Sequence, residues 1–223
     1  SAGSGRISVA LGDANGDGKI DVLTANADSG DVAVLFGNGD GTLGLAQFYT
    51  AGYRPLSIGV GDFNNDGKID VVTSNRDGNN VSILLNRGDG TFNAQQQIAV
   101  GAEPCSVAVG DVNGDGKVDL VTANRWYNSV SVLLGSGDGQ FATQLSSPAG
   151  GFVNFVALGD VNNDGRLDIA AGSVWFAAPD WKQHPVLAMP KQFSPKEYSD
   201  TFCNWSEDVD GDRKSTRLNS SHT

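Results

Sequence analysis

Hydrophobic residues alternate with small or polar residues ahead of several Gly-Asp pairs along this chain. The first such segment contains Ile7, Val9 and Leu11, and a later one contains Ile58 and Val60. Alternation with a period of two predicts a β-strand with one buried face. We therefore expect a half-buried strand directly before each Gly-Asp pair.

A second hydrophobic segment follows a polar stretch in each case, and it is nearly continuous. In the first case it contains Ile20, Val22 and Leu23. Runs of β-branched residues of this kind are typical of strands that are buried on both faces. The corresponding residues further along the chain are Ile69, Val71 and Val72; Val118, Leu120 and Val121; and Leu167 and Ile169.

Two more strands are predicted after each of these segments. A short polar turn at residues 28–30 leads into Val32 to Phe36, which we expect to pair with the preceding strand as a hairpin. A Gly-Asp-Gly turn at residues 39–41 then leads into a weaker strand at Gln47 to Thr50. With no helical periodicity between them, these segments predict a four-stranded antiparallel sheet in each unit.

The polar stretch between the first two predicted strands has the pattern DxNxDGxxD and occurs four times. Its first residues are Asp13, Asp62, Asp111 and Asp160, so 62−13, 111−62 and 160−111 all give a period of 49 residues. A fifth copy opens at Asp208, 48 residues after Asp160. Repeats of about 50 residues with short strands and turns are typical of β-propeller blades. We therefore expect an all-β chain that forms a partial β-propeller, with the polar loop between the first two strands of each blade.

The fourth unit departs from this pattern after Ile169. Its turn is replaced by residues Trp175 to Pro179, and no second Gly-Asp-Gly turn occurs near Leu187. The sequence from Gln183 to Trp205 is richer in proline and aromatic residues. We interpret this part as a variant blade edge with an inserted or longer connection.

The strand expected after the fifth loop is missing. Residues Arg213 to Thr223 instead resemble the in-frame translation of a widely used sequencing-library adapter. We place the start of the adapter-derived tail at Asp212. We therefore divide the chain into a propeller fragment at residues 1–211, with four blades and the start of a fifth, and a non-native tail at residues 212–223. On this interpretation the natural gene continues and the chain is part of a larger propeller. The alternative is a genuine basic, disordered C-terminus.

Oxygen-bearing side chains occupy positions 1, 3, 5 and 9 of each polar loop, and a glycine always follows position 5. The glycine permits a sharp turn, so that these side chains and the carbonyl of position 7 converge on one point. Calcium prefers roughly six to eight hard oxygen ligands in a flexible cage, whereas magnesium demands a tighter octahedron. The sequence therefore predicts Ca²⁺ in a structural role. The predicted ligands, with lysine and arginine contributing only backbone carbonyls, are Asp13, Asn15, Asp17, Lys19 and Asp21; Asp62, Asn64, Asp66, Lys68 and Asp70; Asp111, Asn113, Asp115, Lys117 and Asp119; Asp160, Asn162, Asp164, Arg166 and Asp168; and Asp208, Asp210 and Asp212 of the fifth copy.

The acidic loops have two other interpretations, as ordinary turns and as EF-hand loops. Asp, Asn and Gly are also ordinary turn formers. An EF-hand loop would need a glutamate at position 12, which no copy has. The Gly-Asp-Gly turns at Asp40, Asp89 and Asp138 lack a comparable ligand set, and we expect them to be turns only.

The composition supports a cation as the partner of these loops. The net charge is −11, and 15 of the 26 acidic residues lie in the loops, three in each complete copy and three in the fifth. No basic surface is visible that could neutralise phosphates, which argues against a nucleic-acid partner. No hydrophobic run is long enough to span a membrane. Cys105 and Cys203 could form a disulfide or could be two small buried apolar residues.

The loop, its 49-residue period and the strand pattern resemble the FG-GAP or VCBS repeats of integrin-type β-propellers. The resemblance extends from Ala2 to about Ala171, and more loosely to Gly211. It implies calcium loops between the first two strands of each blade, and a secreted or cell-surface location. Members of the family function in adhesion, in carbohydrate recognition and as accessory domains of enzymes, so the resemblance does not identify a ligand.

We expect a calcium-stabilised, non-catalytic extracellular module for binding or adhesion that recognises protein or glycan. Two aromatic pairs favour this, since Trp126-Tyr127 and Trp175-Phe176 both lie 15 and 16 residues after the first aspartate of their loop. This spacing predicts that both pairs lie at the turn between the second and third strands, side by side in adjacent blades. Exposed aromatic residues stack on sugars or anchor protein contacts. The alternative is that both pairs pack between blades.

An enzyme is the competing class, for example an accessory or scaffold domain of a carbohydrate-active enzyme whose catalytic part lies outside this chain. Most of the carboxylates are already assigned to calcium loops, which leaves few for acid–base catalysis. His184 and His222 are the only histidines, and the second lies in the suspect tail. The GxSxG, HExxH and phosphate-loop motifs are absent from the sequence.

Overall fold

The structure is a computed structural model that describes residues 5–142 and 145–186. These residues form strands, bridges and turns but no helix, and accordingly no membrane-spanning helix is found among them. The strands are β1 (Arg6–Gly12), β2 (Asp21–Asn26), β3 (Asp31–Leu35), β4 (Gln47–Thr50), β5 (Pro55–Gly61), β6 (Asp70–Asn75), β7 (Asn80–Leu84), β8 (Gln96–Ala99), β9 (Pro104–Gly110), β10 (Asp119–Asn124), β11 (Ser129–Leu133), β12 (Leu145–Pro148), β13 (Val156–Gly159), β14 (Asp168–Ala171), β15 (Val174–Ala177) and β16 (Lys182–Pro185).

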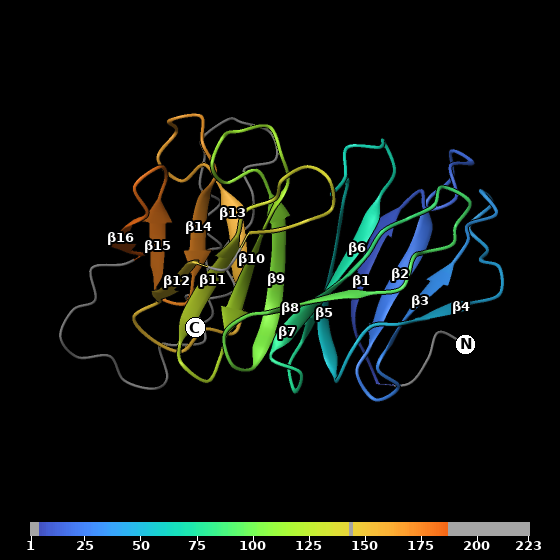
Figure 1. Ribbon diagram of the computed structural model, residues 1–223, viewed down its shortest axis with the longest axis horizontal. Coiled ribbons are helices and arrows are strands. Elements are labelled where there is room, and N and C mark those ends of the chain that lie inside the picture. Colours follow the sequence, from blue (N-terminus) through green and yellow to red (C-terminus); the bar gives the residue numbers. More distant parts are fainter. Residues whose placement is uncertain (1–4, 143–144, 187–223) are drawn as a thin grey trace, which may run out of the picture. The chain divides into compact units, whose positions relative to one another are not determined.

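The strands form four sheets of four strands each, and the strands follow one another across each sheet in chain order (Figure 1). Neighbouring strands pair antiparallel throughout, as in β1 with β2 and β2 with β3. This arrangement confirms the predicted partial β-propeller of four-stranded antiparallel blades. We number the sheets blades 1 to 4 in chain order.

The hydrophobic core lies between consecutive blades. Between blades 1 and 2, for example, Leu23 and Val34 pack in one cluster with Val71 and Leu84. Equivalent clusters lie between blades 2 and 3 and between blades 3 and 4. Each junction therefore buries one face of each of its two sheets, which explains why second and third strands are hydrophobic on both sides.

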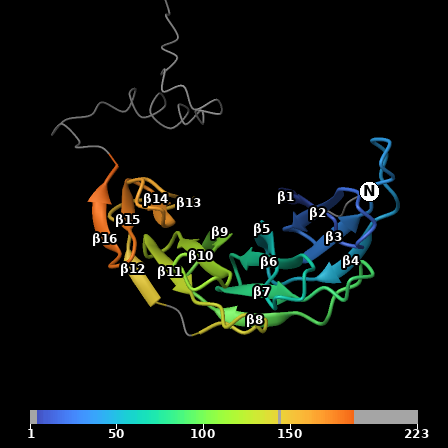
Figure 2. The ribbon, with the colours of Figure 1, turned by 90° about the horizontal axis from the view of Figure 1, so that it is seen from above.

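The first strands of consecutive blades also contact one another, β1 with β5, β5 with β9 and β9 with β13 (Figure 2). A serine of one first strand accepts a hydrogen bond from the backbone of the next. The backbone N–H groups of Ile58, Val107 and Val156 donate to the hydroxyls of Ser8, Ser57 and Ser106, each at 3.3 Å. These bonds repeat the same junction three times.

Ile20 was expected inside the second strand, but β2 begins at Asp21 and the Ile20 side chain is 60% exposed. Residues Leu187–Thr223 lie outside the described residues. The predicted fifth loop with Asp208, Asp210 and Asp212, the boundary at residue 211, the tail and Cys203 all lie there, so these predictions are untested. Cys105 is described, and it is a free, partly buried thiol.

Candidate metal loops and the opposite rim

The four acidic loops connect the first and second strands of the blades, and in Figure 1 they lie along the upper edge. Their turns depend on left-handed backbone at the glycine after position 5, with φ near 80° at Gly18, Gly67 and Gly116 and 85° at Gly165. Position 4 is also left-handed, and glycine or asparagine occupies it in every copy, as in Asn65 with φ 56°. Glycine and asparagine tolerate this backbone best, which accounts for the restricted choice at position 4.

The oxygens of positions 1, 3 and 5 are held by backbone N–H groups of the loop itself. In blade 1, the Asp13 carboxylate accepts hydrogen bonds from the N–H of Gly16 at 2.7 Å, of Asp17 at 3.1 Å and of Gly18 at 2.7 Å. The Asn15 Oδ1 atom accepts from the N–H of Asp17 at 3.0 Å. The other loops repeat most of this set, so the predicted ligand positions 1, 3 and 5 are gathered around one loop interior.

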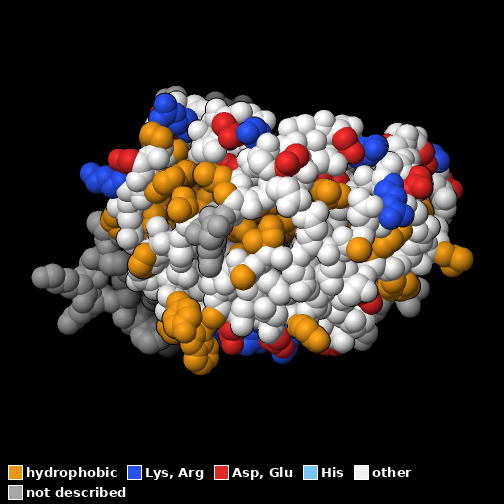
Figure 3. Space-filling model, in the orientation of Figure 1, with side chains coloured by type: hydrophobic (Ala, Val, Ile, Leu, Met, Phe, Trp, Pro, Cys, Tyr) orange, Lys and Arg blue, Asp and Glu red, His pale blue; other side chains and the backbone are white. Residues whose placement is uncertain are grey.

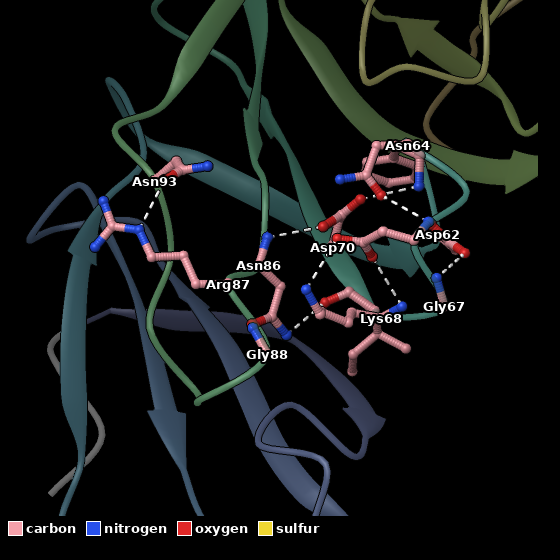
Figure 4. Close-up of polar contacts among 12 residues, drawn as sticks. Asp62, Asn64, Gly67, Lys68, Asp70, Asn86, Arg87, Gly88 and Asn93 are labelled. Atoms are coloured by element: carbon pink, nitrogen blue, oxygen red, sulfur yellow. Dashed lines mark hydrogen bonds and ion pairs between the residues drawn. The ribbon is translucent and has the colours of Figure 1, made fainter.

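Position 9 has a different environment from the one expected. Asp70 is fully buried, and its carboxylate accepts hydrogen bonds from the N–H of Phe63 at 2.9 Å and of Asn86 at 2.7 Å (Figure 4). These donors lie in the loop and directly after β7, so the carboxylate joins three segments of its blade. Equivalent pairs of bonds are made by Asp21, Asp119 and Asp168. We call these four residues the clamp aspartates.

The clamp role could not be read from the loop alone. In blades 1 to 3 the second donor of each clamp lies 16 residues further along the chain. The signal available in the sequence was the recurrence of Gly37, Asn86 and Gly135 at the same 49-residue period.

Negative charge accumulates around the clamp aspartates. Burial raises the pKa of Asp70 to about 6, against the lowering effect of its two backbone hydrogen bonds. The nearby charges of Asp62 and Asp66 raise this pKa further. Burial raises the pKa of Asp119 in the same way. A cation placed among these carboxylates would favour their ionised form and relieve the repulsion between them.

The lysine at position 7 partly neutralises the loop. The Nζ atom of Lys19 lies 3.2 Å from the carboxylate of Asp17, and Lys68 lies at the same distance from Asp66. A backbone hydrogen bond from Lys19 is the main cause that lowers the pKa of Asp17. These ion pairs are partly exposed, so they contribute little to stability and would be weak competitors for a divalent ion.

The donor chemistry of the loops fits calcium, since all candidate ligands are oxygens of carboxylates, an amide and a backbone carbonyl. In residues 5–142 and 145–186, however, no group of three or more Asp, Glu, His or Cys side chains is arranged to hold a metal ion. The clamp carboxylate is turned to backbone N–H groups instead. A carboxylate has about four lone-pair sites, so a clamp oxygen that accepts one N–H can still bind an ion.

The end of the blades opposite the loops, which we call the opposite rim, carries the second-to-third strand turns and the connections between blades. Trp126 and Tyr127 lie in the β10–β11 turn, as predicted, and are 66% and 70% exposed. Figure 3 shows hydrophobic side chains projecting from the lower edge, where this turn lies in Figure 1. The equivalent residues of blades 1 and 2 are small or acidic, for example Asp28 and Asp77.

The predicted placement of the second aromatic pair is wrong. Trp175 and Phe176 lie within β15, not in a turn. Phe176 is 3% exposed in the core between blades 3 and 4, and Trp175 stacks on His184 with ring centroids 4.6 Å apart. The reason is the short β14–β15 connection, in which Gly172 with φ 61° turns the chain at once. The two aromatic pairs therefore do not form one surface.

The opposite rim also carries an open groove of about 990 Å³ that sequence reasoning missed. Its lining includes Asp28, Tyr53, Arg54, Asp77 and Gln97. A guanidinium nitrogen of Arg54 lies 3.8 Å from the Asp77 carboxylate, and Tyr53 is 78% exposed. The signal in the sequence was the Tyr53-Arg54 pair, because the next connection between blades has Ala and Glu at these positions.

The fold resembles those of several solved proteins. A lectin from Agrocybe aegerita, described by its recognition of non-reducing terminal N-acetylglucosamine, is 24% identical with a TM-score of 0.51, over 74% of this chain and 45% of the lectin. BBS1N in complex with ARL6DN is 12% identical with a TM-score of 0.55, over 82% of this chain and 55% of the other. The rhamnogalacturonan lyase YesW is 15% identical with a TM-score of 0.50, over 77% of this chain and 40% of the lyase. At such low identity the likeness concerns the fold alone.

The repeat itself is the more specific match. No curated protein matches the chain significantly. The FG-GAP-like repeat matches residues 13–73, 62–122 and 111–171, so that each match begins at the first aspartate of one loop and extends into the second strand of the next blade. The chain therefore belongs to the FG-GAP-like repeat family.

Proposed function

We propose that this protein is a calcium-stabilised, non-catalytic extracellular module that binds glycans through the opposite rim. The observation that carries the proposal is the exposure of Trp126 and Tyr127, at 66% and 70%, in a turn whose equivalents in blades 1 and 2 are not aromatic. Adjacent exposed hydrophobic side chains can mark an interaction site, and the faces of aromatic rings suit the apolar faces of sugars.

Calcium has a structural role in this proposal. Positions 1, 3, 5 and 9 and the position 7 carbonyl of each loop would hold the ion, which would neutralise carboxylates that now repel one another. The ion would also tie the clamp aspartate, and with it three segments of a blade, to the loop. Catalysis is not expected at these loops, since their oxygens are committed to the ion.

The groove supports a polar ligand on the same rim. Arg54 can donate hydrogen bonds to hydroxyl groups, and Asp28 and Asp77 can accept them, while Tyr53 offers an exposed ring. Neutral polyhydroxylated ligands use this mixture of carboxylate, guanidinium and aromatic groups. The lectin with a similar fold supports the choice of a glycan over a protein, as a likeness only.

Glycan-array binding followed by calorimetry tests the proposal, with oligosaccharides that end in N-acetylglucosamine among the probes. We expect Trp126→Ala with Tyr127→Ala to weaken binding at least about tenfold. Tyr53→Ala reports separately on the groove, and Leu45→Ala, at a 92% exposed residue near the loop end, is the matched control. Binding that survives both aromatic changes and Tyr53→Ala contradicts a glycan site on this rim.

The alternative function, an accessory domain of a carbohydrate-active enzyme, is compatible with the fold likeness to the lyase. Both functions predict glycan binding by this chain. They differ in whether the complete gene encodes a catalytic domain, so the sequence of the source locus distinguishes them.

A further inference from the structure

Two arginines occupy equivalent positions at the opposite rim. Arg76 directly follows β6 of blade 2, and Arg125, 49 residues later, directly follows β10 of blade 3. The backbone N–H of Arg76 donates to the carbonyl of Arg54 at 3.1 Å. In the same way, the N–H of Arg125 donates to the carbonyl of Glu103 at 3.0 Å. Both arginines are therefore held by the same backbone contact with the connection from the preceding blade.

The side chain of Arg76 is paired with two carboxylates. Its Nη2 atom donates a hydrogen bond to Glu103 at 3.2 Å, and its Nε atom lies 4.0 Å from the carboxylate of Asp77. In the groove between blades 1 and 2, Arg54 is paired as well, at 3.8 Å from Asp77. The positive charges of these two arginines are therefore balanced by acids of the chain itself.

Arg125 has aromatic residues in place of such acids. Trp126 lies 49 residues after Asp77. Phe152 lies 49 residues after Glu103. None of the ion pairs among the described residues involves Arg125, and this residue is exposed. Near blades 3 and 4, the opposite rim therefore carries an arginine charge next to an aromatic turn.

Phe152 brings a third exposed aromatic side chain to this part of the rim, at 84% exposed. It lies in the connection between blades 3 and 4, which contacts the turns of both blades. The N–H of Ala149 donates to the carbonyl of Asn128, in the turn of blade 3, at 2.8 Å. An atom added as Cβ at Gly172, in the turn of blade 4, would lie 3.0 Å from the carbonyl oxygen of Phe152. The backbone of this connection is therefore held between the two turns, while the Phe152 side chain is exposed.

We propose that the glycan bound at this part of the rim is acidic and that Arg125 and Phe152 are two of its binding residues. This inference rests on the glycan binding proposed above. A planar guanidinium matches a carboxylate, or an oxyanion such as sulfate, with two parallel hydrogen bonds. The apolar face of the same sugar packs on an exposed ring, that of Phe152 or of Trp126. The groove between blades 1 and 2 differs, because its arginine is already paired with Asp77.

The net charge of −11 does not oppose an anionic ligand at this rim. The acidic loops lie at the other end of the blades. Strand β10 runs from one end to the other and has 6 residues, which corresponds to about 20 Å. At physiological ionic strength, charges are screened over ~8 Å. The loops therefore contribute little repulsion to an anion at Arg125.

A glycan array followed by calorimetry tests the inference. The probes carry glucuronate, galacturonate or sialic acid, each beside its methyl ester, and galactose oligomers with and without sulfate distinguish the two anions. We expect the acidic form to bind at least about tenfold more tightly than the neutral form, since only the acid makes charge-assisted hydrogen bonds. Arg125→Gln should remove this preference and leave the affinity for the neutral form unchanged, whereas Phe152→Ala should weaken both. Arg87→Gln is the matched control, at an exposed arginine of the loop end that forms no ion pair among the described residues.

Several outcomes would overturn the inference without touching the proposed function. Equal affinity for each acid and its neutral form is one, and a preference that persists in Arg125→Gln is another. In both cases the proposed function still stands if Trp126→Ala with Tyr127→Ala abolishes glycan binding. Unchanged binding in Phe152→Ala overturns the assignment of that residue. A polyglutamate peptide that binds as tightly as the best acidic glycan overturns the choice of a sugar, because charge alone would then suffice. A protein that binds none of the glycans contradicts both proposals.

Discussion

The two ends of the blades differ in how uniform their residues are from one repeat to the next. At the loop end, positions 1, 3, 5 and 9 carry the same residue types in all four described copies. At the opposite rim, the equivalent turn residue is Asp28 in blade 1 and Asp77 in blade 2 but Trp126 in blade 3. The uniform end contains the buried clamps that hold each blade together, whereas the exposed turn residues Trp126 and Tyr127 of the variable end belong to none of the core clusters. Repetition at the loop end therefore serves stability, and the turns at the other end can vary without loss of the clamps.

Removal of calcium should have the largest effect, because it acts on every loop at once. If calcium binds, millimolar calcium and a dissociation constant of ~0.1 mM would give each site about 1.4 kcal/mol by mass action. The four described loops together would then contribute about 6 kcal/mol, comparable to the stability of a whole domain. We expect a chelator to lower the melting temperature sharply in calorimetry. An unchanged melting curve would contradict a structural role for calcium, and the loops would then be turns only.

Phe176→Ala should have the next largest effect on stability. It tests whether this side chain belongs to the core or to the exposed turns of the opposite rim. Phe176 was expected in an exposed turn but is 3% exposed between blades 3 and 4. Truncation of a buried phenylalanine costs about 3 to 5 kcal/mol. Denaturant unfolding checks this value. A change in the free energy of unfolding near zero would contradict the buried position of Phe176.

The metal-free protein should lose stability as the pH rises from about 4 to 7. The pKa of Asp70 is about 6 in the folded state and about 3.9 in an unfolded chain, so the folded state binds this proton more tightly. Its contribution therefore favours folding below pH 4 and declines as the pH rises through 6, by on the order of 3 kcal/mol.

The measurement is unfolding in chelator at several pH values, for the wild type and for Asp70→Asn. The difference between the two isolates Asp70, since other carboxylates titrate in both proteins. With calcium present the direction reverses, because the ion binds the ionised carboxylate. If the difference in the free energy of unfolding between the wild type and Asp70→Asn does not change with pH, the raised pKa of Asp70 is contradicted.

The sequence predicted the fold well because both of its signals are periodic. The weak strand predicted at Gln47 to Thr50 is β4 as observed, and the strand predicted at Val32 to Phe36 is β3 shifted by one residue. Alternation along a strand and the 49-residue period along the chain depend only on local sequence. Blade number and strand order within the described residues follow from these signals alone.

The site was harder to predict, since its details depend on register and connection length. Trp175 was misplaced because counting from Asp160 assumes a constant turn length, whereas the chain turns at Gly172. The clamp role of Asp70 depends on the N–H of Asn86, which only the pairing of β6 with β7 brings close. The exposure of Ile20 depends on which neighbour covers blade 1, which its own sequence does not specify.

Replacement of the aromatic turn should have the smallest effect on stability. Trp126 and Tyr127 are exposed and belong to none of the core clusters, so the double change to alanine should alter the free energy of unfolding by less than about 0.5 kcal/mol. Denaturant unfolding in calcium checks this, with Phe176→Ala as the buried aromatic control. If the double variant loses glycan binding but keeps its stability, recognition and stability are carried by opposite ends of the blades. If it is destabilised as much as Phe176→Ala, the turn is structural and the division between the two ends fails.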